Sequence, residues 1–202
     1  MREKILVIDC ETGGLDSEQH SLLSIGGVVL DIKKSQIIDL FSFYIKEPTL
    51  TVQQEALDVN QINLNLIIKC GLSPQNAVEE ITNKIQHEFG FGNKVLLAGH
   101  NVGFDVAFLK RLFRLANCSN LYKNYFLHRV IDTASIAQFL ELVNQAPEGT
   151  SSLDSILKFT KVPILNKKRH CAVDDANLTA QALLKLINIF KGKNKETYDK
   201  EI

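Results

Sequence analysis

The stretch Ile5-Leu6-Val7-Ile8-Asp9-Cys10-Glu11-Thr12-Gly13-Gly14 places two acidic residues at the end of an apolar segment. Four consecutive aliphatic residues predict a buried strand, and the threonine and glycines that follow predict a turn. Residues two apart on a strand point to the same face, so Asp9 and Glu11 present two carboxylates together while Cys10 faces the core. Paired carboxylates repel each other unless a cation joins them, and hard divalent cations bind such pairs. The pattern predicts either a metal site or a solvated strand end.

Two further strands are predicted over residues 22–31 and 37–45, where Ile, Val and Phe are frequent. The short link between them indicates a hairpin, so the chain begins with three antiparallel strands. Helices and strands then alternate, with strands expected at 94–98 and 129–131 and helices at 74–85, 104–116, 133–143, from 151, and at 172–190. This order predicts one α/β domain with a mixed sheet over residues 1–190, followed by a polar C-terminal tail at 191–202.

The charge balance limits the classes of function. The 202 residues include 23 Lys and Arg against 23 Asp and Glu, so the formal net charge is zero. A neutral chain does not hold polyanions by its overall field, and nucleic acid would have to be recognised at a local site. The start of the chain has no apolar stretch long enough for a signal peptide or a membrane-spanning helix. Four scattered cysteines without a C-x-x-C pair are therefore expected to be reduced thiols in a cytoplasmic protein.

A second polar motif, His100-Asn101-Val102-Gly103-Phe104-Asp105, lies between a predicted strand and a predicted helix. Asp105 falls in the first turn of that helix, where the helix N-terminus favours an anion or a ligand. Helix capping is the alternative explanation, and it is the stronger one for this motif taken alone. His100 ends a buried strand and is expected to be a hydrogen-bonded structural residue rather than a base.

A third motif, His170-Cys171-Ala172-Val173-Asp174-Asp175, follows the basic run at 167–169. Five residues correspond to about 140° of rotation on a helix, so His170 and Asp175 converge only if His170 lies on the loop before the helix. An imidazole near a metal site can act as a general base at neutral pH. The third motif therefore predicts one further metal ligand and a base.

Together the three motifs supply four acids and a histidine, namely Asp9, Glu11, Asp105, Asp175 and His170. Such a set suits two ions about 3.5–4 Å apart that clamp the attacking and leaving oxygens of a phosphodiester. In this order the motifs resemble the DEDDh 3′–5′ exonucleases, a family that includes the proofreading epsilon subunit of bacterial DNA polymerase, ribonuclease T and oligoribonuclease. The similarity rests on Asp9-Cys10-Glu11-Thr12-Gly13-Gly14-Leu15, His100-Asn101-x-x-Phe104-Asp105-x-x-Phe108-Leu109 and His170-x-Ala172-x-x-Asp175-Ala176. The register of the third motif selects Asp175 over Asp174.

The resemblance implies an RNase H-like fold and release of nucleoside 5′-monophosphates from the 3′ end of single-stranded DNA or RNA. It implies two Mg²⁺ or Mn²⁺ ions on the four acids, with His170 as general base. It also implies that a loop at residues 48–62 lies against the terminal nucleotide, with Glu55 at the 3′-hydroxyl and Asn60 toward the phosphate. The expected substrate contacts are Thr12, Gly13, Leu15, Glu55, Asn60, Asn101, Phe104 and His170. For Phe104, a place in the core is an equally good expectation.

Other readings remain open at this point. Asn60 and the Asp132-Thr133 pair favour a ribonuclease T-like enzyme that trims RNA 3′ ends, and Asp132 itself is expected to be structural, at a helix start. A catalytically inactive nucleic-acid-binding module, an RNase H-type endonuclease and a zinc site using Cys10 are weaker alternatives, the last because Cys10 faces away from Asp9. The expected partners are a single-stranded 3′ end and either a second copy of the chain or a polymerase or other replication, repair or RNA-processing protein. No membrane is expected.

Overall fold

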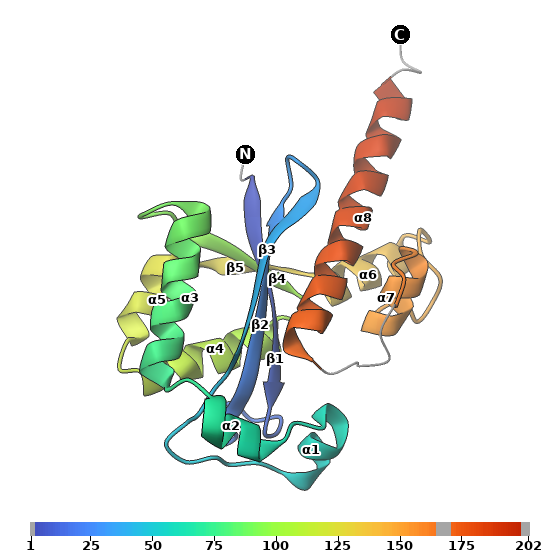
Figure 1. The fold of residues 1–202 in the computed structure, drawn as a ribbon. Helices are drawn as coiled ribbons and strands as arrows, with labels where there is room; N and C mark the ends of the chain where they lie inside the picture. The colour runs from blue at the N-terminus through green and yellow to red at the C-terminus, as the bar shows by residue number, and fades with distance from the viewer. Residues whose placement is uncertain (1–2, 165–170, 199–202) are drawn as a thin grey trace.

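The computed structural model describes residues 3–164 and 171–198, which form a five-stranded sheet with helices on both faces (Figure 1). The strands are β1 (Lys4–Thr12), β2 (Leu22–Asp31), β3 (Gln36–Tyr44), β4 (Val95–Gly99) and β5 (Phe126–Asp132). Their order across the sheet is β3-β2-β1-β4-β5, with β1–β2 and β2–β3 antiparallel and β1–β4 and β4–β5 parallel. The predicted mixed sheet is confirmed.

The helices of the described residues are α1 (Gln54–Asn60), α2 (Leu64–Cys70), α3 (Pro74–Phe89), α4 (Gly103–Leu115), α5 (Ser119–Tyr125), α6 (Thr133–Leu142), α7 (Leu153–Phe159) and α8 (Ala172–Tyr198). The expectation of a loop over residues 48–62 was wrong in part, because residues 54–60 form α1. Helices α2 and α5 were not predicted. Each of these three helices has only seven residues, which is too short for hydrophobic periodicity to mark.

Helix α8 also differs from its predicted extent. It was expected to end near residue 190, but it continues to Tyr198 and runs past the edge of the sheet (Figure 1). The added segment contains no proline, and its single glycine, Gly192, costs only about 1 kcal/mol in a helix. Polar composition alone therefore did not mark the end of this helix.

Alternate residues of β1 face two separate cores. Leu6 and Cys10 pack in the core that α3 and α4 form on one face of the sheet, whereas Val7 packs in the core formed with α8 on the other. Figure 1 shows α3, α4 and α5 on one side of the sheet and α6, α7 and α8 on the other. Because side chains alternate along a strand, Asp9 and Glu11 belong to the α8 side of β1.

Side-chain caps fix the starts of three helices, and one of them, Asp132, was placed at a helix start from the sequence. The Ser73 hydroxyl accepts a hydrogen bond from the backbone N–H of Asn76 at the start of α3, and Pro74 occupies the first turn. Asp132 caps α6 and Ser152 caps α7 in the same way. These caps satisfy N–H groups that have no partner within the helix, which is why Ser and Asp are favoured there.

All four cysteines carry free thiols, as expected for reduced side chains. Within the described ranges, no helix combines the length and the apolar character that crossing a bilayer requires.

Candidate active site

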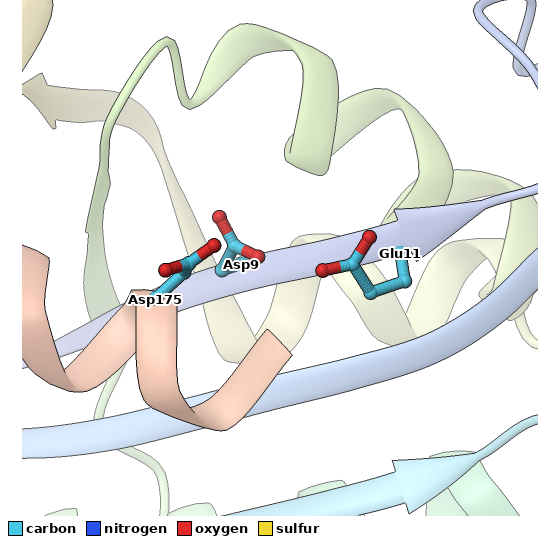
Figure 2. A group of neighbouring side chains, drawn as sticks. All are labelled: Asp9, Glu11 and Asp175. Atoms are coloured by element: carbon cyan, nitrogen blue, oxygen red, sulfur yellow. The ribbon is translucent and has the colours of Figure 1, made fainter. Parts of the chain in front are cut away.

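Three acidic side chains converge near the carboxyl end of β1 (Figure 2). Asp9 and Glu11 project from β1, and Asp175 projects from the first turn of α8. One carboxylate oxygen from each side chain lies within 4.8 Å of those of the other two. The spacing of Asp9 and Glu11 thus places their carboxylates together, and α8 adds a third from the far end of the sequence.

Gly26 is the residue that lets α8 approach β1 this closely. It lies opposite Asp9 in the β1–β2 ladder. A Cβ at Gly26 would stand 2.3 Å from the carbonyl carbon of Ala172 and from the backbone nitrogen of Val173, so a larger residue would collide with the start of α8. Gly26 was not predicted from the sequence to be part of the site. The available signal was a glycine pair inside a predicted strand, which commonly marks a close backbone approach.

The environment of Glu11 disfavours its charged form. Burial, followed by the nearby carboxylates of Asp175 and Asp105, raises the pKa of Glu11 to about 8. Without a cation, the Glu11 carboxyl therefore holds a proton at neutral pH. A divalent ion would replace that proton, because it offsets the same repulsion with positive charge.

Asp105 lies in the first turn of α4 and is buried. Burial raises the pKa of Asp105 to about 7, while hydrogen bonds from its own backbone N–H and from Cys10 oppose this shift. Among the described acids, Asp105 is not part of the group whose oxygens lie within 4.8 Å of one another. It is nevertheless close enough to raise the pKa of Glu11. The structure therefore brings the fourth predicted acid beside the other three rather than among them.

The donor set of Asp9, Glu11 and Asp175 fits a hard divalent cation. It offers only carboxylate oxygens, the ligands that Mg²⁺ and Mn²⁺ prefer. Cys10 points into the opposite core, and burial together with the Asp105 carboxylate raises the pKa of its thiol well above the ordinary value. A zinc thiolate site at Cys10 is thus disfavoured on both geometry and protonation.

The turn after β1 carries three of the predicted substrate contacts. The Thr12 hydroxyl donates a hydrogen bond to the carbonyl of Gly14 at 2.8 Å, and Gly13 lies so close to Thr51 that a Cβ would stand 2.4 Å from the Thr51 carbonyl oxygen. Leu15 follows with 85% of its surface exposed. A large apolar side chain held out into solvent four residues after Glu11 suits contact with a nucleobase.

Arg111 of α4 ties the segment after this turn to the helix. The Arg111 guanidinium donates hydrogen bonds to both carboxylate oxygens of Glu47, at 3.0 and 2.8 Å, and further bonds to the carbonyls of Ser17 and Glu18. Glu47 is buried and also accepts the backbone N–H of Leu22 at 3.0 Å. The same helix that carries Asp105 therefore fixes the segment that carries Leu15. Neither Arg111 nor Glu47 was identified from the sequence, because no local pattern marks a contact 64 residues apart.

Helix α1 brings Glu55 and Asn60 to this region. Glu55 is exposed in the first turn of α1. The Asn60 amide donates a hydrogen bond to the carbonyl of Thr12 at 3.0 Å, and its oxygen accepts the backbone N–H of Ile62. The buried Asn60 side chain thus holds α1 against the end of β1, in addition to any contact with substrate.

The second motif is anchored to β5. The backbone N–H of Asn101 donates to a carboxylate oxygen of Asp132 at 2.8 Å, and the His100 ring is hydrogen bonded to the Thr133 hydroxyl at 3.0 Å. His100 and Asp132 therefore have the structural roles that the sequence predicts. The Asn101 residue itself is exposed, with a positive φ of 57°.

Phe104 and His170 are the last two predicted substrate contacts. The Phe104 ring is half-buried and packs against the Phe108 ring, with a centroid distance of 4.9 Å, so it contributes to the α4 core. His170 lies outside the described residues, two positions before α8 begins.

The chain thus combines a mixed five-stranded sheet with carboxylates gathered at the end of its central strand. The family model described as "Exonuclease" matches residues 6–183, and the chain belongs to this family. It is an exonuclease domain.

Two groups of curated relatives match the chain. The PolC-type DNA polymerase III of Clostridium perfringens is 31% identical over 182 residues, which cover 90% of this chain but only 11% of that protein. Ribonuclease T of Hahella chejuensis is 26% identical over 204 residues, covering 97% of this chain and 88% of that protein. The chain thus corresponds to a small part of the polymerase and to most of the ribonuclease.

Solved structures show the same fold. The nuclease domain of 3′hExo, described as a DEDDh family member bound to rAMP, superposes with a TM-score of 0.72 at 19% identity and covers 92% of both chains. The E. coli ExoI–ssDNA complex gives a TM-score of 0.71 at 18% identity, over 98% of this chain and 43% of that one.

Proposed function

We propose that the chain hydrolyses the last phosphodiester at the 3′ end of single-stranded DNA or RNA and releases nucleoside 5′-monophosphates. The observation that carries this proposal is the convergence of Asp9, Glu11 and Asp175. The raised pKa of Glu11 indicates that three negative charges are not held together there without a cation. The catalytic domain is taken as residues 1–190, consistent with the family match over 6–183, and the end of the chain, in which α8 continues to Tyr198, is left outside it.

Asp9, Glu11, Asp105 and Asp175 would hold two Mg²⁺ or Mn²⁺ ions. When bound, such ions lower the pKa of water and neutralise charge that develops on the phosphate. Asp9 would contribute ligands to both ions, Glu11 and Asp175 to the first, and Asp105 to the second. In this proposal, His170 removes the proton from the attacking water and the 3′-oxygen of the penultimate nucleotide leaves.

The remaining residues position the end of the strand. Leu15 and Phe104 contact the terminal bases, and Glu55 accepts a hydrogen bond from the 3′-hydroxyl. Thr12, Gly13, Asn60 and Asn101 line the path of the terminal nucleotide. Support comes from their location around the carboxyl end of β1, where the turn, α1 and the start of α4 meet.

The two groups of relatives favour different substrates and different partners. The ribonuclease T relatives, most of whose length the chain covers, favour trimming of RNA 3′ ends. In that role the chain would act alone or as a homodimer. The PolC-type relatives favour a proofreading role beside a polymerase. Either role would take place in the cytoplasm. The ribonuclease T-like reading has the more complete coverage of both chains and is our second candidate function.

A labelling experiment tests the proposal. Single-stranded DNA and RNA oligomers, each labelled at the 5′ or the 3′ end, are incubated with the protein and Mg²⁺ and resolved on a gel. We expect 5′-labelled strands to shorten in a ladder and 3′-labelled strands to yield a mononucleotide at once, with Asp9→Asn inactive. A circular single strand should stay intact. Its cleavage would indicate an endonuclease instead, and equal activity of Asp9→Asn would contradict the site.

A further inference from the structure

A groove lies along the edge strand β5, on the α4 side of the sheet. It is bounded by α4, α5 and β5 and has a volume of about 630 Å³. None of Asp9, Glu11 and Asp175 lines this groove, so it is separate from the acidic triad. Its volume is in the range of about 300–1,000 Å³ that is typical of small-molecule sites.

The rim of this groove is basic although the whole chain is neutral. Lys94, Lys110, Arg114, Lys123 and His128 line it, and none of its described lining residues is acidic. Arg114 is paired with Glu18 at 2.9 Å. In the described part of the chain, the three lysines have no ion pair with an acid. Positive charge is therefore concentrated at one place, and it favours an anionic ligand.

The floor of the groove is apolar and partly aromatic. It consists of Val106, Tyr122, Phe126, Leu127 and Val130. Tyr122 packs on Phe126 with a centroid distance of 4.9 Å, and the Lys110 ammonium lies 5.7 Å from the Tyr122 ring centre. A cation therefore stands directly beside an apolar surface. Inorganic phosphate would use only the rim, and a purely apolar ligand only the floor.

We infer that this groove binds a nucleotide, with its base on the floor around Tyr122 and its phosphate at Lys110 and Lys123. Aromatic surfaces that hold bases beside cations that hold phosphates are the usual means of binding single-stranded nucleic acid. The nucleotide can be free or an internal unit of a strand. Only the binding of an internal unit of a strand rests on the proposed function. Binding can be measured without hydrolysis, so the two proposals can be tested separately.

Binding in EDTA tests the inference on the full chain. Fluorescently labelled single-stranded oligomers of four and twelve nucleotides are titrated by anisotropy, and AMP is titrated by calorimetry. The variant is the double charge reversal Lys110→Glu with Lys123→Glu. The matched control is Lys34→Glu with Lys185→Glu, exposed lysines in the β2–β3 hairpin and on α8 that give the same change in net charge.

We expect the groove variant to weaken binding roughly tenfold or more and the control to change it by less than about twofold. Loss of AMP binding assigns a free nucleotide, whereas loss confined to the longer oligomer assigns a strand. Affinities unchanged for all three ligands would overturn the inference. So would an acidic peptide that binds more tightly than the oligomers with the same dependence on Lys110 and Lys123, which would assign a protein partner.

A second measurement does not depend on a variant. Photo-crosslinking of a thiouridine-containing oligomer followed by mass spectrometry should attach the strand to the peptide that contains Tyr122 and Phe126. Crosslinks confined to other segments would contradict the groove. If hydrolysis fails in every assay while these crosslinks persist, the proposed function falls and the nucleotide site stands.

Discussion

Gly26 of β2 lies directly opposite Asp9 of β1, and the main chain of α8 fills the space that a side chain at Gly26 would need. The absence of one Cβ thus determines how closely Asp175 can approach the two carboxylates of β1. The geometry of the site depends on this contact as much as on the acids themselves.

Replacing Gly26 with alanine should therefore separate α8 from β1. We expect Gly26→Ala to lower the free energy of unfolding by about 1–3 kcal/mol, as overpacking does. Nuclease activity with Mg²⁺ should fall roughly tenfold or more, because a misplacement near 1 Å has a large effect at a reacting centre. Gly103→Ala is the matched control, since a Cβ there meets no atom within 4 Å. Full activity of Gly26→Ala would show that the close contact is not needed.

The raised pKa values of Glu11 and Asp105 predict how stability changes with pH. In the folded chain the pKa of Glu11 is about 8 and that of Asp105 about 7, whereas their ordinary values are 4.5 and 3.8. The metal-free protein should therefore lose stability as the pH rises from about 4 to 8, because the unfolded chain releases these protons first.

Mg²⁺ should reverse this trend. The increase in Tm caused by Mg²⁺ should be larger at about pH 8 than at about pH 6, where protons compete with the ion. Thermal unfolding in EDTA and in Mg²⁺ at both pH values measures the difference. Glu11→Gln should reduce the pH dependence, and a Mg²⁺ effect that is equal at both pH values would contradict the assigned protonation.

The pair formed by Arg111 and Glu47 predicts a stability effect at a distance from the acids. Arg111→Met leaves a buried carboxylate without its cation, which typically costs about 3–5 kcal/mol. Urea unfolding should show this loss, and KM for an oligomer should rise because the segment with Leu15 is released. Arg114→Met removes an exposed pair with Glu18 and should cost no more than about 1 kcal/mol. If the two substitutions lower the free energy of unfolding equally, the pair of Arg111 with Glu47 does not fix this segment.

Leu15 offers a change that separates binding from stability. Because its side chain is 85% exposed, Leu15→Ala should alter the free energy of unfolding by less than about 0.5 kcal/mol. KM for a single-stranded oligomer should rise by roughly tenfold, as expected for loss of one base contact. Leu142→Ala, at 82% exposure on α6, is the matched control. If both variants bind the oligomer like the unmodified protein, Leu15 has no part in holding substrate.

The sheet could be predicted because its strands carry strong local signals. The aliphatic run before Asp9 and the alternation of helices and strands after residue 73 determine the architecture, and serine and aspartate caps mark helix starts. The pairing of Asp9 with Glu11 follows from strand periodicity. These features depend on near neighbours in the sequence.

The features that were missed depend on contacts between distant segments. Short helices such as α1 and α5 are stabilised by packing rather than by a periodic pattern. Gly26 matters only once α8 rests on β2, and Glu47 matters only once Arg111 reaches it across the fold. The hydrogen bond from Asn60 to the end of β1 is of the same kind. No pattern of single residues encodes such contacts.

Two neighbouring acids in the first turn of α8 provide the most direct test of the proposed site. The measurement is the rate of 5′-mononucleotide release from a single-stranded oligomer in Mg²⁺ by Asp175→Asn and by Asp174→Asn. Only Asp175 has an oxygen within 4.8 Å of those of Asp9 and Glu11 among the described acids. We expect Asp175→Asn to lose activity by several orders of magnitude and Asp174→Asn to stay close to the unmodified protein. Equal activity of the two variants would contradict the account.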